Sequence, residues 1–533
     1  MNLTIKMLNR RDFITLLGSG SLAFLSSGLA ADSWRSSARA SDLAYSDNEL
    51  DLIVRIQSVP SQVHVFNGPK TNVWSYRGEV LQGNPASLIS MDNDSYLGPI
   101  LRLIQGHRVR IIFQNVLPVE SIIHWHGLQV PAEMDGHPRL TIPSGDEFVY
   151  EFQVQDRAGT YWYHPHPHGR TGHQVYAGMA GLLLVSDDDE KKLNLPMGAY
   201  EVPLVIQDRM FNRDNQLVYL PDGMMSQVNG MLGDTILING RPDYTLNVAT
   251  RVYRLRLLNG SNARAYNLAW SDGTPLTILG TDGGLLAKPW ITRSVMLGPG
   301  ERLDVWADFS NHEVGDHLRL LSQSFDDESS QMMPGRRGHG MMGGSSAPPN
   351  GATLNLMTVR IVEKAVESRT LPTWLSKDSG LSPNDALNRG NPRKFELGMF
   401  QMHGLINGRT FQMTTVADDE VVTAGSSEIW DFVNVRSSMG MMKMSMAHPM
   451  HLHGAQFRVI ARSATTNLNY MDKGWKDTVL LMPEERIQLH IRFGKHAGMF
   501  LYHCHNLEHG DAGMMRNYLI RNNGVPKRTS MLT

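Results

Sequence analysis

The sequence has almost no cysteine. Cys504 is the only one among 533 residues, so a disulfide within the chain is excluded and cysteine usage does not indicate the redox compartment. An excess of one charge is also lacking, since 50 basic residues oppose 52 acidic ones and the formal net charge is −2. This balance gives no reason to expect a nucleic-acid or membrane partner. Partners must therefore be inferred from individual sites.

Long apolar runs are scarce as well. The stretch from Phe13 to Leu29 is the one candidate for a membrane anchor, but it is short and rich in Gly and Ser. Arg10 and Arg11 precede it, and small residues follow it. This pattern predicts a twin-arginine signal peptide over residues 1–40, which is removed after export. We therefore expect the twin-arginine export machinery as a partner, a periplasmic location and no stable membrane span.

The single cysteine stands among metal-binding residue types. It is flanked by His503 and His505, and His509 and Met514 follow at intervals of five residues. A lone cysteine is more often a small buried hydrophobe, but a thiolate with imidazole and thioether partners is the ligand set of a blue-copper site. On an extended strand Cys504 would face away from its two neighbours. Three consecutive residues would then join two metal sites.

Three further segments contain histidine pairs separated by one residue. They hold His124 and His126; His164 and His166, with His168 beside them; and His448, His451 and His453. Such a pair on an extended strand places two imidazoles on one face. Together with the cysteine segment, these clusters supply the donors for more than one metal ion.

The histidine segments repeat each other. Segment 158–166 matches segment 497–505 at Ala, Gly, Tyr and both histidines, with proline in place of the cysteine. Segment 124–127, His-Trp-His-Gly, is likewise matched by segment 451–454, His-Leu-His-Gly. We therefore predict two homologous domains that face each other with eight imidazoles between them. The thiolate site belongs to the later domain alone.

Short runs of β-branched and aromatic residues, bounded by Gly, Asn, Pro or Asp, predict the strands of β-sandwiches. Three of these runs continue into Asn115, Asn259 and Asn434. The tetrapeptide Ile-Asn-Gly-Arg at 238–241 recurs at 406–409. These repeats indicate three copies of one domain.

We place the three domains at 41–190, 191–365 and 366–533. The middle copy contains none of the histidine pairs, and we predict that it holds the other two in register. Segment 335–351 is rich in Gly, Ser and Pro and is expected to form a surface loop without a core of its own.

With these motifs, the chain resembles the multicopper oxidases, and among them the bacterial copper efflux oxidases. The resemblance covers nearly the whole chain and implies three cupredoxin-like Greek-key β-sandwich domains, an all-β fold. It also implies a monomer with four copper ions, one of type 1, one of type 2 and two of type 3. The implied ligands are His448, Cys504, His509 and axial Met514 for type 1; His124 and His451 for type 2; and His126, His164, His166, His453, His503 and His505 for the type 3 pair.

The resemblance further implies one-electron oxidation of a substrate at the type 1 site, coupled to the reduction of O2 to water. Electrons would pass from Cys504 through its flanking histidines. Asp135 matches an acidic residue that relays protons near the trinuclear site. A glutamate that follows the last type 1 histidine in the efflux oxidases is replaced here by Gly510, which leaves Glu508 or Asp511 as candidates for its role.

Methionines indicate the substrate. Six of them lie between residues 439 and 450, before and after the type 1 ligand, and their thioethers select Cu(I) over harder ions. By resemblance, Met446 and Met399 match a substrate-copper site, and Met444 replaces its aspartate. The methionines at 332–342 could take the place of the Met/His-rich insertion of the best-known members.

Other functions stay open at this stage. The first alternative to a Cu(I) oxidase is a laccase-like oxidase of phenols or aromatic amines, in which a small organic reductant docks at a type 1 histidine. A copper-storage protein would need no complete trinuclear set. A copper-free relative that acts at the division septum would lack these ligands, and a nitrite reductase would lack the type 3 pair.

Overall fold

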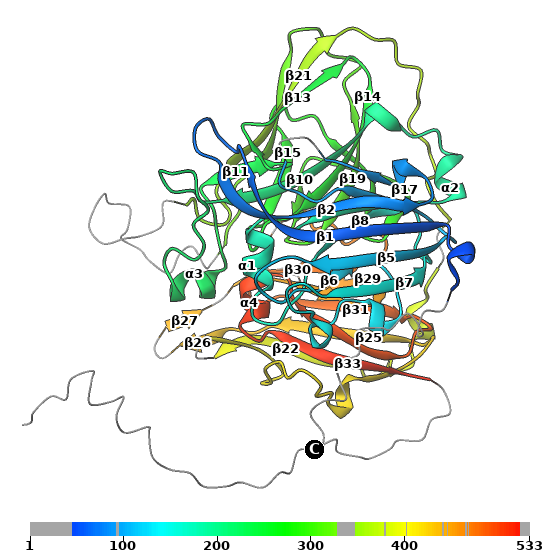
Figure 1. Ribbon diagram of the computed structural model, residues 1–533, viewed down its shortest axis with the longest axis vertical. Coiled ribbons are helices and arrows are strands. Elements are labelled where there is room, and N and C mark those ends of the chain that lie inside the picture. The colour runs from blue at the N-terminus through cyan, green and yellow to red at the C-terminus, as the bar shows by residue number, and fades with distance from the viewer. Residues whose placement is uncertain are drawn as a thin grey trace, which may run out of the picture. The chain divides into compact units, whose positions relative to one another are not determined.

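Six large β-sheets form three packed pairs, as Figure 1 shows, in the part of the chain that the computed structural model describes. That part comprises residues 45–91, 95–327, 347–377, 380–400, 402–439, 442–444, 446–463, 466 and 468–522, and the side chains between 437 and 445 are left aside. The predicted signal peptide and the methionines at 332–342 lie outside the described residues. The predicted all-β fold of three cupredoxin-like sandwiches is confirmed.

The first pair of sheets holds strands β1 to β9. Across one sheet the order is β2 (Thr71–Gln82), β1 (Leu52–Val63), β5 (Arg108–Asn115) and β7 (Glu147–Gln153). Across the other it is β3 (Leu88–Ile89), β4 (Ile100–Ile104), β9 (Gly181–Ser186), β8 (Gly159–Pro165) and β6 (Ile123–His126).

The second pair holds strands β10 to β21. One sheet runs β12 (Arg241–Pro242), β11 (Thr235–Ile238), β10 (Glu201–Arg209), β14 (Val252–Asn259), β19 (Arg302–Asp308), β16 (Leu276–Thr281) and β17 (Gly284–Thr292). The other runs β13 (Thr245–Ala249), β21 (Leu354–Glu363), β20 (His317–Ser322), β15 (Tyr266–Trp270) and β18 (Val295–Leu297).

The third pair holds strands from β22 onward. One sheet runs β23 (His403–Ile406), β22 (Arg393–Phe400), β25 (Ser427–Asn434), β31 (Arg486–Phe493) and β29 (Ala455–Arg462). The other runs β24 (Val421–Thr423), β33 (Met515–Arg521), β32 (Gly498–Cys504), β28 (His448–Leu452) and β30 (Thr478–Leu481). Strands β26 (Ser437–Met439) and β27 (Met442–Met444) form a separate hairpin.

Sheet membership changes between Ser186 and Glu201 and again between Glu363 and Arg393. These changes support the domain boundaries near 190 and 365, which stay a prediction.

Strand β5 illustrates why these segments form sandwiches. Val109, Ile111 and Phe113 alternate along it and are at most 1% exposed, because successive side chains of a strand point to opposite faces. Each fully buried side chain of this kind stabilises the fold by about 1.5 to 3 kcal/mol. They join a core cluster that also takes residues from β8 and β9 in the facing sheet.

The repeated asparagines have the same structural task in all three sandwiches. Each is buried at the end of a strand and donates its side-chain amide to two main-chain carbonyls. The acceptors are Val119 and Ile142 for Asn115, Arg264 and Leu297 for Asn259, and Met446 and Met482 for Asn434. The repeat therefore reflects one way of closing a sandwich, used three times.

The repeated tetrapeptide is a tight turn. Asn239 and Gly240 have φ of 53° and 81°, and Asn407 and Gly408 have φ of 51° and 70°. Two consecutive residues with positive φ characterise the type I′ hairpin turn, for which Asn-Gly is the favoured pair.

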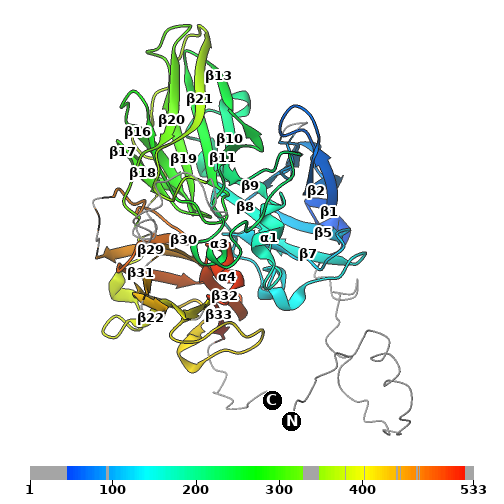
Figure 2. The same ribbon diagram turned by 90° about the vertical axis from the view of Figure 1, so that its left-hand side faces the viewer.

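Besides short 3-10 turns, the described residues contain four short α-helices: α1 (Thr171–Tyr176), α2 (Asp188–Lys191), α3 (Met224–Asn229) and α4 (Leu507–Asp511). Figure 2 shows α1, α3 and α4 side by side where parts of all three sandwiches meet. None of the helices in the described ranges is long and apolar enough to cross a membrane.

Candidate metal centre

Strand pairing brings the histidine segments together in two equivalent ways. Strand β6 pairs with β8 so that His124 lies opposite His164, and β28 pairs with β32 so that His451 lies opposite His503. The repeated sequences therefore occupy repeated positions. The eight histidines of these pairs are each at most 3% exposed.

The eight imidazoles divide into two trios and a pair. One trio is His126, His164 and His505, and the other is His166, His453 and His503, with the donor atoms of each trio within 4.8 Å of one another. The pair is His124 and His451, whose Nε2 atoms are 3.3 Å apart. Both trios and the pair combine residues of the first and third sandwiches. This division matches a type 3 pair with three imidazoles for each ion and a type 2 site with two.

Hydrogen bonds fix which nitrogen of most rings faces its neighbours. Five rings have Nδ1 within 2.6 to 3.0 Å of an oxygen atom, to which an N–H must donate. The acceptors are the main-chain oxygens of Asp135 for His124, Pro165 for His164, Asp477 for His451 and Cys504 for His503, and the Asp135 carboxylate for His453.

The remaining Nε2 atoms of these five rings carry lone pairs. Two such atoms, of His453 and His503, are only 3.1 Å apart, so without a cation their lone pairs would repel. Neither nitrogen of His505 has a hydrogen-bond partner among the described residues. Converging imidazoles of this kind fit metal ions, whose ligating nitrogens are typically fixed by a hydrogen bond at the other nitrogen.

Protons cannot take the place of the metal. Burial lowers the pKa of His164 and His503 to about 3, and it lowers the pKa of His124 and His453 well below the ordinary value. These four rings are consequently neutral, which is the form that binds metal. Clusters of neutral imidazoles suit copper among the first-row ions.

The thiolate site lies on the other side of the same strand. Cys504 Sγ is 3.5 Å from His448 Nδ1 and 3.7 Å from His509 Nδ1, and the two nitrogens are 3.2 Å apart. Burial raises the pKa of Cys504, so a thiolate here needs a neighbouring cation. Two imidazoles and one thiolate form the equatorial set of a blue-copper site.

Met514 adjoins this site, although its role as axial ligand stays a prediction. The residue is fully buried in the same core cluster as Cys504. Its N–H donates to the main-chain oxygen of His509, and its oxygen accepts from the N–H of Cys504.

A main-chain carbonyl covers the outer edge of one thiolate-site imidazole. His509 Nε2 is 2.8 Å from the oxygen of Val228 in α3, to which it donates. His509 and His448 are 0% and 2% exposed. This contact could not be predicted from the sequence, because α3 belongs to the middle sandwich. It fixes the ring so that Nδ1 faces Cys504.

Asp135 is a buried residue of the site and not a solvated loop carboxylate. It is 1% exposed, and its Oδ2 atom accepts from His453 Nδ1 at 2.6 Å. Its Oδ1 atom has no hydrogen-bond partner among the described residues, and burial raises its pKa well above the ordinary value. The next residue, Gly136, has φ of 80°, and a Cβ atom added to it would lie 2.1 Å from the oxygen of Ile123. The turn that places Asp135 therefore requires glycine at position 136.

Asp477 is a second buried carboxylate of the site, and the sequence did not single it out. Its Oδ1 atom is 3.0 Å from His126 Nε2, so His126 donates there and turns Nδ1 toward its trio. Its main-chain oxygen accepts from His451. One residue thus orients a ring of a trio and a ring of the pair.

The middle sandwich holds Asp477 in place. Arg302 at the start of β19 donates to both of its carboxylate oxygens, at 2.7 and 2.5 Å, and both side chains are 0% exposed. Burial alone would raise the pKa of Asp477, but Arg302 and His126 lower it well below the ordinary value. Lys476 and Asp282 form an adjacent buried ion pair at 2.9 Å. The middle sandwich therefore reaches the histidine cluster without contributing a ligand.

The two candidates for the missing glutamate are already engaged. Glu508 accepts from Tyr219, Asn262 and the N–H of Met231. The Asp511 carboxylate accepts from the first two N–H groups of α1. Both carboxylates are thus hydrogen-bonded, and the role of either in place of the residue missing at Gly510 stays a prediction.

The other candidates are placed as follows. His168 belongs to none of the metal-binding groups among the described residues, and its ring packs 4.9 Å from that of Phe411. Met399 and Met446 are 8% and 5% exposed and lie in the core cluster of Cys504. Met444 ends β27, and its side chain is outside the described part of the structure.

Comparison with known proteins gives one family. Models described as "Multicopper oxidase" match residues 75–190, 201–333 and 383–524. A laccase of Bacillus subtilis is 30% identical over 499 residues, covering 84% of this chain and 90% of its own. The cell division protein FtsP of Dickeya dadantii is 32% identical over 446 residues, covering 83% and 86%. The McoA multicopper oxidase of Aquifex aeolicus has a similar structure, with TM-score 0.74, 33% identity and coverage of 88% and 96%.

Replacing Asp477 tests whether this residue orients the imidazoles. We expect Asp477→Asn to lower the copper content and to alter the copper spectrum, because His126 loses the carboxylate that fixes its orientation, whereas His451 keeps its main-chain acceptor. The substitution also leaves Arg302 buried without its partner, at a cost of about 3 to 5 kcal/mol in unfolding free energy.

Glu420→Gln is the matched control. Glu420 binds Arg516 through two hydrogen bonds of 2.7 and 2.8 Å, and both side chains are at most 4% exposed. Comparable destabilisation with an unchanged copper spectrum is expected of it. If the two variants retained copper and spectrum equally well, Asp477 would be a purely structural residue.

Proposed function

The chain belongs to the multicopper oxidase family. We propose that it couples the one-electron oxidation of a reductant to the reduction of O2 to water, and that this reductant is Cu(I). The observation that carries this proposal is the division of eight buried imidazoles into two trios and a pair beside a single thiolate site. Sequence identity alone does not decide between an oxidase and a structural protein. Relatives of similar identity, 30% and 32%, bear the names of a laccase and of a cell division protein. The complete donor set favours an enzyme over a storage or structural protein.

The proposed ligands are those of the sequence analysis. We assign the thiolate site to type 1 copper, the pair to type 2 copper and the trios to the type 3 pair, four copper ions in all. Bound copper would supply the one-electron redox chemistry and the binding of O2, which no side chain provides.

The protein itself contributes orientation, connection and proton handling. Cys504 belongs to the thiolate site and its neighbours His503 and His505 to the two trios, so one strand connects the sites by covalent bonds. We assign Asp135 the delivery of protons toward reduced oxygen. Its buried Oδ1 atom lacks a hydrogen-bond partner among the described residues, and its Oδ2 atom holds a ring of the cluster.

Burial of the type 1 imidazoles supports Cu(I) as the reductant. The rings of His448 and His509 are almost fully covered, which leaves no surface on which an organic ring could stack. Met399 and Met446 lie in the same core cluster as Cys504, and buried thioethers favour Cu(I) over harder ions. Together with Met444 they are the proposed route for the substrate ion. Oxidation of Cu(I) would serve copper tolerance.

The alternative is a laccase-like oxidase of phenols or aromatic amines. One similar structure, from Ochrobactrum, bears a title that calls it a laccase-like multi-copper oxidase with activity towards lignin model compounds. We propose the periplasm as the location on the strength of Arg10, Arg11 and the apolar stretch after them. Export by the twin-arginine machinery and a monomeric state belong to the same proposal.

Removing the thiolate tests the electron path. We expect Cys504→Ser to abolish the blue absorption and oxygen uptake while the circular dichroism stays that of the wild type, because serine keeps the size of the side chain but not the soft ligand. Bound copper should fall by about one ion per chain. Turnover that persists in this variant would show that the thiolate does not carry the electrons.

Replacing Met446 tests the substrate. We expect Met446→Leu to lower kcat/KM for Cu(I) about tenfold, since a soft donor is lost, and to leave kcat/KM for a phenol nearly unchanged. Steady-state oxygen uptake of copper-loaded enzyme measures both.

Met357→Leu is the control for a buried methionine, since Met357 is 1% exposed in the core of the middle sandwich. A Met-to-Leu change at constant volume should cost less than about 1.5 kcal/mol in either position. Equal effects of Met446→Leu on both substrates would contradict a Cu(I) site there.

A further inference from the structure

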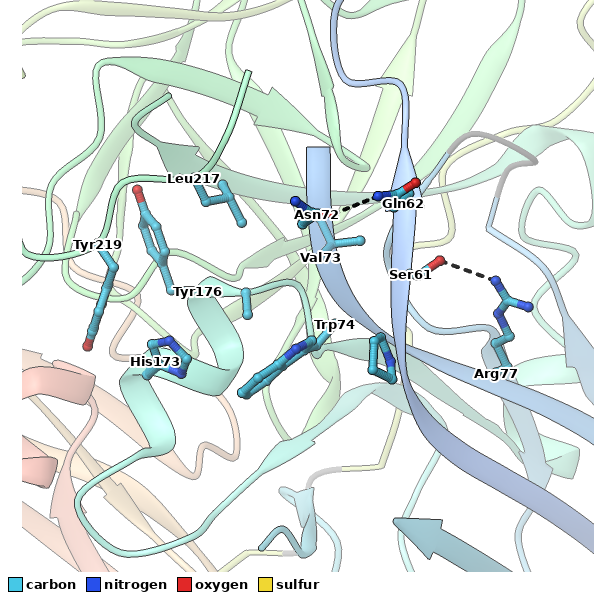
Figure 3. Close-up of a pocket in the computed structure, with 12 residues that line it drawn as sticks. Ser61, Gln62, Asn72, Val73, Trp74, Arg77, His173, Tyr176, Leu217 and Tyr219 are labelled. Carbon is cyan, nitrogen blue, oxygen red and sulfur yellow. Dashed lines mark hydrogen bonds between the residues drawn. The ribbon is translucent and has the colours of Figure 1, made fainter. Parts of the chain in front are cut away.

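A groove of about 640 Å³ opens between the first sandwich and the chain that follows β10. Figure 3 shows Trp74 on β2, His173 and Tyr176 on α1, and Tyr219 around its interior. Its volume is that of a small-molecule site, for which about 300 to 1,000 Å³ is typical.

Two of the three ring pairs around the groove are arranged edge to face, and the third is tilted. The Trp74 and His173 centroids are 5.2 Å apart with planes at 77°, and His173 and Tyr219 are 5.5 Å apart at 71°. Tyr176 lies 5.0 Å from Tyr219. Aromatic rings prefer this geometry, so a planar aromatic ligand can extend the series. The N–H of Trp74 donates to the oxygen of Ala177 at 2.9 Å, which holds β2 against the end of α1.

The charge of the lining restricts the ligand further. None of the twelve described residues that line the groove has a carboxylate, and Arg77 supplies a guanidinium at its edge. The lack of a carboxylate and the guanidinium at the edge favour a neutral or anionic aromatic molecule over an organic cation.

Hydrogen bonds tie the groove to the helix that contains His509. The Tyr219 hydroxyl donates to Glu508 Oε1 at 2.9 Å, and Glu508 directly precedes His509. The Asp511 carboxylate accepts from the N–H groups of Thr171 and Gly172 at 3.0 and 2.8 Å, which fastens α1 to α4. Tyr219 in the wall of the groove is thus connected to His509, the proposed type 1 ligand, through one hydrogen bond and the residue Glu508.

Direct approach to the type 1 rings is closed. Val228 covers the outer edge of His509, and His448 is 2% exposed. An aromatic donor therefore has to bind at a distance, and the groove offers aromatic partners on the side where α1 meets α4.

We propose that this groove binds planar aromatic electron donors, phenols and their anions, as a second entry point for electrons. The inference rests on the proposed oxidase function and names a site for its organic substrates. A phenol bound there loses one electron and releases its proton to water. O2 accepts the electrons and takes up as many protons, four of each, to give two waters.

The first test is binding without turnover. The ligand is 4-nitrophenol, which resists oxidation, and its Kd for copper-loaded enzyme is measured by equilibrium dialysis. His173→Ala and Trp74→Leu should each raise Kd about three- to tenfold, the effect of losing one aromatic contact. His173 is exposed, so its replacement leaves the fold intact even where that of Trp74 does not.

The second test is the ratio of kcat/KM for 2,6-dimethoxyphenol to kcat/KM for Cu(I), from oxygen uptake. The same two variants should lower this ratio about three- to tenfold through a higher KM for the phenol. Trp374→Leu is the control, because Trp374 is 61% exposed and stacks under Lys288 away from the groove. It should change neither Kd nor the ratio.

A Kd that is the same in wild type, His173→Ala and Trp74→Leu would overturn the groove as a binding site, whatever the enzyme oxidises. An unchanged ratio in variants with weakened binding would overturn its use as an entry point. Failure of the oxidase function itself is separate, since it would abolish oxygen uptake with every donor while leaving the dialysis result intact.

Discussion

The structure depends on one constraint: eight buried imidazoles face each other across the interface between the first and third sandwiches. Burial lowers the pKa of His164 and of His503 to about 3, so protonation of these rings does not relieve the repulsion between neighbouring lone pairs. Main-chain oxygens and two carboxylates occupy the outward nitrogens of six rings. Cations at the centre of the arrangement would remove this repulsion, so we expect metal binding to stabilise the interface between the first and third sandwiches.

The middle sandwich takes part in this constraint although it has no ligand. Arg302 holds Asp477, and Asp477 orients His126 and His451. On the opposite side, Val228 holds His509 of the thiolate site. The middle sandwich therefore positions rings in both groups of candidate ligands without supplying a ligand itself.

Repeats within the sequence predicted most of the fold. The asparagines at strand ends and the Ile-Asn-Gly-Arg turns occupy equivalent positions in the sandwiches because their roles are local. The asparagines donate hydrogen bonds to two main-chain carbonyls, and the tetrapeptides form two-residue hairpin turns. The two faces of the strand at Cys504 also follow from local geometry, since alternation is a property of any extended chain. The histidine and cysteine groups could therefore be predicted without the structure.

Contacts between distant segments could not be predicted. In the sequence, Lys476 and Asp477 are two adjacent residues of opposite charge, as is common on protein surfaces. Only the fold shows that their partners Asp282 and Arg302 belong to another sandwich. The same holds for Val228, and for Glu508 and Asp511, whose carboxylates accept hydrogen bonds from Tyr219 and from the start of α1. The groove likewise combines segments that are distant in the sequence, such as those of Trp74 and His173.

The most direct test of the account is the copper content of fully reconstituted wild-type protein, measured together with the fraction that electron paramagnetic resonance detects. Two trios, one pair and one thiolate site predict about four copper ions per chain, of which the coupled pair in the trios is silent, so that about half of the copper is detected. Fewer than about four ions, or a signal from all of them, would contradict the assignment of these histidines to a type 2 site and a type 3 pair.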